Sequence, residues 1–211
     1  MDIPVYKTEG IILKKTDLSD TDRLLTVYTQ KFGKILVRAK GVGKKESKLK
    51  FLIEPFNIYE FLLVCSKNID VLANSYPIKE FLYLRQNLEN LALAIYFAEL
   101  VDKLVVAPEQ DENIWALIVR AMEVLDKPFK ELSKTKPQAQ ARGAEPRTVP
   151  QSGTGAWVKT AFEKRLLEFL GHPSFATQSK LSPKEKLNYL QSLAGDEIKS
   201  ERFLRSLSLI S

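Results

Sequence analysis

The fold is decided by residues 21–50, which read TDRLLTVYTQKFGKILVRAKGVGKKESKLK. The run Arg23–Thr29 is rich in β-branched and aromatic residues, which suit a pleated, half-buried strand. A second strand is expected at Lys34–Lys40. Between them, Gly33 can take the positive φ that a tight hairpin loop requires. The stretch therefore predicts a β-hairpin that leads into a loop rich in glycine and lysine.

The second strand of this hairpin separates apolar and basic side chains. Residues on one face of a strand recur with a period of two, so the inner face is expected to carry Ile35, Val37 and Ala39. The outer face then carries Lys34, Leu36, Arg38 and Lys40. This outer face is either the solvated side of an ordinary sheet or a track for backbone phosphates, and the basic loop that follows favours the track.

The positive charge of the protein is concentrated in residues 31–50. This stretch has eight bases against one acid, a net charge of +7, whereas the whole 211-residue chain carries +6. A focused positive field on a small β-rich module indicates a nucleic-acid surface. The loop GVGKKES lacks the spacing of a phosphate-binding P-loop.

Seven bases and one aromatic ring are the candidate DNA contacts. The bases would bind phosphates, which gives affinity and salt dependence without sequence information. They are Lys34, Arg38, Lys40, Lys44, Lys45, Lys48 and Lys50. Phe32, in the hairpin loop, is the candidate for base stacking, with Tyr28 and Phe51 as weaker ones. Trp115 and Trp157 are expected in the core or at a domain interface.

Three further strands are expected around this hairpin, at Glu9–Leu13, Pro55–Val64 and Ile69–Ala73. Five short strands within about 75 residues suggest a small closed barrel, of which the OB-fold is one type. The spacing alone fits an SH3-like barrel equally well.

A helical pattern begins near Pro77. Apolar residues at helical spacing predict one long helix over 82–106 and a second over 112–125. Residues 133–155 are poor in large apolar side chains and read as a disordered insert. Helices are expected again at 156–170, from Ser182 to about Ala194, and after a cap at Asp196.

The expected fold class is therefore α+β, a five-stranded OB-fold followed by a helical bundle domain with a disordered insert. The expected domains are 1–78 and 79–211, with 172–211 as a small C-terminal helical module.

Composition argues against catalysis and metal binding. The chain has one cysteine, Cys65, and one histidine, His172, so neither a Cys-rich zinc site nor a Cys/His catalytic arrangement is supported. Asp17, Asp20 and Asp22 lack the spacing of a calcium loop and are interpreted as turn formers. With no signal peptide or apolar span in the sequence, we expect a cytoplasmic protein without cofactor or membrane partner.

Several motifs resemble the RecO family of bacterial DNA repair proteins. In the barrel these are Thr8-Glu9-Gly10-Ile11-Ile12-Leu13, Asp22-Arg23-Leu24-Leu25-Thr26-Val27-Tyr28-Thr29, Gly33-Lys34, Ala39-Lys40-Gly41, Pro55-Phe56 and Tyr59-Glu60-Phe61. In the helices they are Leu84-Arg85 through Tyr96, Glu99-Leu100-Val101-Asp102, Phe162-Glu163, Arg165-Leu166-Leu167 and Leu170-Gly171.

This resemblance implies a recombination mediator associated with the bacterial nucleoid. It implies binding of single-stranded and double-stranded DNA, annealing of complementary strands, and a role in loading recombinase. The implied partners are RecR and the acidic C-terminal tail of single-stranded DNA-binding protein. We expect that tail in a groove between residues 84–105 and 156–170, rimmed by bases such as Arg85, Lys103, Lys164 or Arg165.

The chain departs from many family members at one place. Where they carry a four-cysteine zinc module, residues 172–179 contain no cysteine. The resemblance therefore implies a zinc-free variant, whose C-terminal module is held by packing alone.

Two other functions stay open at this point. One is a general RNA- or ribosome-binding OB-fold protein. The other is a structural adaptor whose basic loop contacts an acidic protein.

Overall fold

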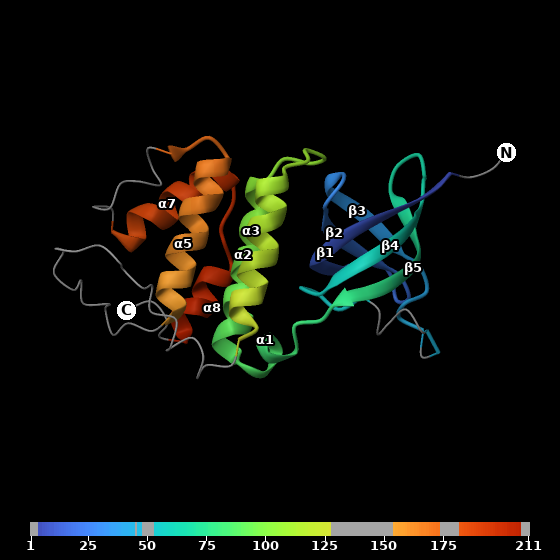
Figure 1. The fold of residues 1–211 in the computed structure, drawn as a ribbon, viewed down its shortest axis with the longest axis horizontal. Coiled ribbons are helices and arrows are strands. Elements are labelled where there is room, and N and C mark those ends of the chain that lie inside the picture. Colours follow the sequence, from blue (N-terminus) through green and yellow to red (C-terminus); the bar gives the residue numbers. More distant parts are fainter. Residues whose placement is uncertain (1–3, 45, 48–52, 128–153, 174–181, 208–211) are drawn as a thin grey trace, which may run out of the picture.

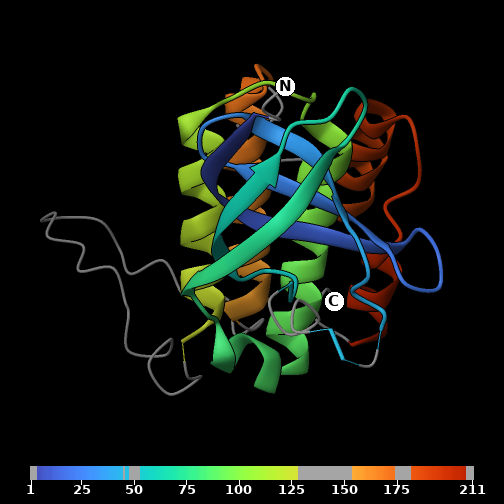
Figure 2. The same ribbon diagram turned by 90° about the vertical axis from the view of Figure 1, so that its right-hand side faces the viewer.

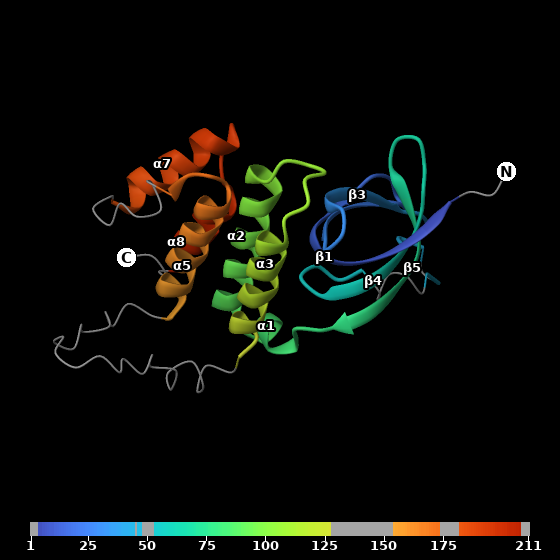
Figure 3. The same ribbon diagram turned by 45° about the horizontal axis from the view of Figure 1, so that its top comes forward.

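The chain forms a β-barrel followed by layers of helices (Figure 1). This computed structural model describes residues 4–44, 46–47, 53–127, 154–173 and 182–207. The barrel lies at one end, helices α2 (Leu88–Leu104) and α3 (Glu112–Leu125) lie next to it, and the C-terminal helices form the far end. The same order appears in the tilted view of Figure 3.

Five strands close the barrel in the order β1-β2-β3-β5-β4. They are β1 (Val5–Asp17), β2 (Arg23–Thr29), β3 (Gly33–Ala39), β4 (Ile58–Val64) and β5 (Asp70–Lys79). All neighbours are antiparallel except β3 and β5, which pair in parallel at Val37–Asp70 and Arg38–Val71. This is the arrangement of an OB-fold, so the SH3-like alternative is excluded.

Strand β1 is much longer than the predicted Glu9–Leu13 because it serves two neighbours. Its first half pairs with β4 and its second half with β2. A register shift between Ile12 and Lys14 leaves Leu13 unpaired with β2. Ile12 lies in the barrel core, while Leu13 packs with the helices. Strand β5 also runs six residues beyond its predicted end at Ala73.

The predicted helix over 82–106 is two helices. Helix α1 (Leu82–Gln86) ends at Asn87, which has extended backbone angles. The Asn87 side chain then accepts hydrogen bonds from the amides of Glu89 and Asn90 and caps α2. An asparagine at a cap satisfies amides that would otherwise lack partners, so it can start a new helix inside an apolar repeat.

Helix α3 has the predicted bounds, and its N-cap is Asp111. The remaining helices are α5 (Thr154–Phe169), α7 (Pro183–Ala194) and α8 (Ser200–Ser206). The predicted capping box of α7 is confirmed by reciprocal bonds between Ser182 and Glu185. Most of the expected disordered insert, 133–155, lies outside the described residues.

The predicted cap at Asp196 is wrong, because α8 begins four residues later. A carboxylate from α2 does the capping instead. Glu99 accepts hydrogen bonds from the amides of Lys199 (2.9 Å) and Ser200 (2.8 Å) and from the Ser200 hydroxyl (2.5 Å). Burial raises the pKa of Glu99, but these hydrogen bonds outweigh it, so the pKa lies below its ordinary value.

One turn further along α2, Lys103 completes this polar clasp. Its Nζ lies 2.6 Å from an Asp196 carboxylate oxygen and 2.5 Å from the Glu197 carbonyl oxygen. The expectation that packing alone holds the C-terminal segment is therefore wrong. Directed polar bonds from α2 fix its position as well.

We expect Glu99→Ala to release α8 from α2. The change leaves two backbone amides and a hydroxyl without their charged acceptor, which costs about 2–3 kcal/mol of unfolding free energy. Amide hydrogen exchange should speed up in α8 before it does in the barrel. Glu80→Ala is the control, since Glu80 is exposed and no partner is found for it in the part of the chain described. Equal exchange in both variants would contradict the clasp.

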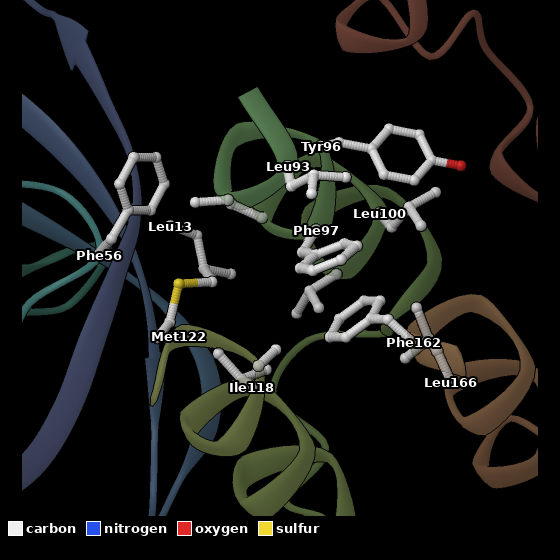
Figure 4. Packing of buried hydrophobic residues seen from close by; sticks show 14 of the residues in the cluster. Leu13, Phe56, Leu93, Tyr96, Phe97, Leu100, Ile118, Met122, Phe162 and Leu166 are labelled. Carbon is white, nitrogen blue, oxygen red and sulfur yellow. The ribbon is translucent and has the colours of Figure 1, made fainter. Parts of the chain in front are cut away.

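Barrel and helices share one apolar core. Besides helical residues, this core contains Ile11, Leu13, Tyr28, Phe56 and Ile58 from the barrel. In Figure 4, Leu13 of β1 and Phe56 of the turn before β4 lie on the barrel side of the core, opposite the side chains of α2, α3 and α5. Viewed from the barrel end in Figure 2, the helices lie directly behind the strands. The barrel is thus anchored on the helices.

No helix among the described residues is long and apolar enough to cross a bilayer. Within the same residues, no group of three or more His, Cys, Asp or Glu side chains is placed to hold a metal ion.

Candidate nucleic-acid interface

The outer faces of β1, β2 and β3 form a continuous surface. Cross-strand pairing aligns Thr16, Leu24 and Arg38 in one row, and Lys14, Thr26 and Leu36 in the next. On β3, Val37 and Ala39 are buried in the barrel, Leu36 is exposed and Arg38 is half-buried. The predicted alternation of the strand is therefore confirmed over this part of β3.

Lys34 lies at the interface between barrel and helices. Its Nζ donates a hydrogen bond to the Asp102 carbonyl oxygen near the end of α2, and burial lowers its pKa. The neighbouring Tyr28 is fully buried and donates to the Asp111 carbonyl oxygen at 3.2 Å. The helices thus cover the Lys34 end of the strand face, and a phosphate contact by Lys34 stays a prediction.

Arg38 is oriented by an acidic partner. Its Nε and Nη2 donate to the same Asp22 oxygen, at 3.0 and 2.7 Å. The second Asp22 oxygen accepts from the Gly41 amide at 2.9 Å. The Gly41 amide and the Arg38 guanidinium together lower the pKa of Asp22. The Arg38 side chain is still 43% exposed, so it also faces solvent.

Lys40 and Lys44 are exposed bases that follow the Arg38–Asp22 ion pair along the chain. Both are exposed, and neither has an ion-pair partner in the part of the chain that the structure describes. Gly41 turns the chain between them with a φ of +68°, and the Lys44 side chain lies over it. The predicted contacts Lys45, Lys48 and Lys50, and Phe51, lie outside the described residues.

The candidate aromatic Phe32 lies at the other end of β3 from Lys40. Phe32 is 41% exposed, and its ring stands edge-on to that of Tyr6, with ring centroids 5.0 Å apart. Of the two tryptophans, Trp115 is buried in the core as predicted, whereas Trp157 is 70% exposed on α5. The prediction that Trp157 is a core or interface residue is therefore wrong for the described part of the chain.

Sequence reasoning missed Lys14. It lies on β1, outside the charged stretch, and only the register of β1 with β2 and β3 places it in one row with Thr26 and Leu36. Its side chain is 60% exposed, and its Nζ is 3.8 Å from an Asp102 carboxylate oxygen. We call the surface made by Lys14, Arg38, Lys40 and Lys44 the basic face.

The four bases expected around a helical groove are not brought together. Arg85 donates to the Pro55 carbonyl oxygen and faces the barrel loop. Lys103 is held by the clasp on α8. Lys164 and Arg165 are exposed on α5, each within 4 Å of Glu168. Only the last two remain candidates for one shared surface.

Residues 1–81, which include the whole barrel, match the family model described as the N-terminal part of recombination protein O. The curated relatives agree with this match. The chain is 31% identical over 121 residues to the DNA repair protein RecO of Pelotomaculum thermopropionicum, covering 57% of this chain and 47% of the relative. The barrel of this chain therefore belongs to the RecO family.

Other RecO proteins match to a similar extent. The one from Dehalococcoides mccartyi is 37% identical over 123 residues, covering 57% of this chain and 48% of the relative. The one from Moorella thermoacetica is 30% identical over 149 residues, covering 71% and 53%. The chain thus spans about half the length of the curated relatives it matches.

Asp102, on α2, lies within 3.8 Å of Lys14 in the basic face. We expect Asp102→Asn to strengthen DNA binding about twofold at low salt, because Lys14 loses a competing carboxylate while the backbone contact to Lys34 remains. Fluorescence anisotropy with a labelled oligonucleotide measures this. Glu89→Gln makes the same change of charge at an exposed site on α2. Equal affinities of the two variants would contradict the effect.

Proposed function

We propose that this chain binds DNA through the basic face and brings complementary strands together during recombinational repair. The observation that supports this most directly is the clustering of Lys14, Arg38, Lys40 and Lys44 on one side of an OB-type barrel. OB-folds commonly bind oligonucleotides on the face of strands 2 and 3 and on adjoining loops. The bases lie on that face and at its end.

Annealing by such a surface needs no chemical step. Positive charge lowers the repulsion between two phosphate backbones and raises the local concentration of both strands. Phosphate contacts carry no sequence information, so any complementary pair can be held. We therefore propose a binding protein rather than an enzyme, acting without nucleotide or metal.

The proposed partners follow the family resemblance. They are single-stranded and double-stranded DNA, RecR, and the acidic tail of single-stranded DNA-binding protein, and the proposed outcome is loading of recombinase in the bacterial cytoplasm at the nucleoid. For the tail, the exposed Lys164 and Arg165 on α5 support a contact with carboxylates. Binding of the isolated tail peptide, compared between the intact protein and a variant with both bases changed to glutamine, tests this part.

The test of the main proposal is annealing of complementary DNA strands coated with single-stranded DNA-binding protein. The protein should speed up duplex formation, and the gain should fall as salt rises. A competition titration with RNA of the same sequence belongs to the same experiment. Preference for RNA would favour a general RNA-binding role, and no affinity for either nucleic acid at moderate salt would favour a protein adaptor.

A further inference from the structure

An acidic residue contacts the basic face. Asp22 immediately precedes β2, and only 13% of its side chain is exposed. One carboxylate oxygen holds the Arg38 guanidinium through two hydrogen bonds. The other accepts from the Gly41 amide and from the Thr21 hydroxyl. One carboxylate therefore connects β3 to the chain that carries Lys40 and Lys44.

The loop after β3 is docked closely onto the turn before Asp22. The Gly43 amide donates to the Thr21 carbonyl oxygen at 2.7 Å. A Cβ atom on Gly43 would lie only 2.4 Å from the Asp20 carbonyl oxygen, so the two segments touch through their backbones. Gly41 has a positive φ and its amide donates to Asp22, while the side chains of Lys40 and Lys44 are exposed.

For Asp22, charge alone predicts a change in DNA affinity of the wrong sign. A carboxylate among phosphate-binding bases repels the ligand, so its removal should strengthen binding. The Asp22 charge, however, is compensated by Arg38 and largely covered. Removing this charge relieves little repulsion of the DNA phosphates. It also frees the Arg38 guanidinium and the loop, which then lose conformational entropy when DNA binds.

We propose that Asp22 is a positioning residue for DNA binding, which sets the Arg38 guanidinium and the Lys40–Lys44 loop in the arrangement that contacts phosphates. This inference rests on the proposed function and adds the group that orders its site. A residue that only contacts DNA would be a base, whereas Asp22 acts through its neighbours. Removal of Asp22 should therefore weaken DNA binding, whereas removal of an ordinary surface acid strengthens it.

The test compares Asp22→Asn with Asp20→Asn. Both remove one negative charge from the same turn, but Asp20 is exposed and no side-chain partner is found for it in the described structure. Binding of labelled single-stranded DNA is measured over a range of salt. We expect Asp22→Asn to bind three- to tenfold more weakly, with a salt slope smaller by about 0.7, the value of one single-strand phosphate contact. Asp20→Asn should bind equally or more tightly.

A coupling measurement separates positioning from a general loss of stability. If Asp22 acts through the loop, Lys44→Gln should cost less affinity in the Asp22→Asn background than in the wild type. Arg38→Lys provides a second route, since it keeps the charge but cannot form the two-bonded contact with Asp22. It should weaken binding even if Asp22→Asn fails to fold.

The possible results are distinguishable. Equal or tighter binding by folded Asp22→Asn overturns the inference, as does unchanged binding by Arg38→Lys if Asp22→Asn does not fold. Additive effects of Asp22→Asn and Lys44→Gln also overturn it. Absence of DNA binding by the wild type overturns the proposed function itself.

Discussion

Replacing both Lys40 and Lys44 by glutamine should weaken binding of single-stranded DNA about 25-fold at 0.1 M salt. Each phosphate contact contributes about 0.7 to the slope of log affinity against log salt, so two lost contacts remove about 1.4 decades relative to 1 M salt. The salt slope should fall by the same 1.4. These two lysines are the best residues for this test because both are exposed and neither forms an ion pair with another described residue. A change at Lys34 would also disturb its contact with α2.

The matched control removes two other lysines from the barrel, Lys7 and Lys79. Each is already paired with an acid, Glu60 and Glu123 respectively, at 2.9 and 2.7 Å. The net charge changes by the same amount as in the test variant. If the control pair weakens binding as much as the test pair, binding depends on total charge and the basic face is not the site.

Phe97→Ala should lower the free energy of unfolding by about 3–5 kcal/mol, the usual cost of removing a buried aromatic side chain. Phe97 is fully buried on α2 and stacks on Phe162 of α5, with ring centroids 4.0 Å apart. Its position within the shared core is seen in Figure 4. Because the same core includes barrel residues, the loss should reach the strands as well as the helices.

Denaturant unfolding followed by fluorescence of the buried Trp115 reports on the helices, and hydrogen exchange at β2 amides such as Val27 reports on the barrel. Both should shift by the same free energy if barrel and helices unfold together. Val106→Ala is the control, because Val106 is 67% exposed and such changes usually stay within about 0.5 kcal/mol. Unchanged exchange in the barrel of Phe97→Ala would show that the two parts unfold independently.

The sequence predicted the elements that depend on local patterns. The alternation in β3, the capping box at Ser182 and the position of α3 all follow from neighbouring residues. The break at Asn87 was missed because the apolar repeat continues across it. An N-cap and a polar residue on a helix surface look alike in sequence, and the extended backbone at Asn87 distinguishes them.

The site was less predictable than the fold, because its members meet through register and tertiary contact. Lys14 reaches the basic face only through its pairing across two strands. Lys34 fits the alternation of β3, but helix α2 covers that end of the strand. Glu99 caps a helix about 100 residues away, and no local sequence motif predicts this contact. The concentration of charge in residues 31–50 predicts a DNA-binding region, and both the region and the contacts within it are predictions that the lysine variants will test.

The covering of β3 by the helices shortens the part of this strand that is open to a ligand. The uncovered segment from Leu36 to Lys40 has five residues, and its first and last Cα atoms are about 13 Å apart at the usual rise per residue. Successive phosphates on one strand of a duplex are about 3.4 Å apart along the axis, so this length matches roughly four of them. We expect a correspondingly short footprint, one that leaves the bases on either side of the bound phosphates free to search for their complement.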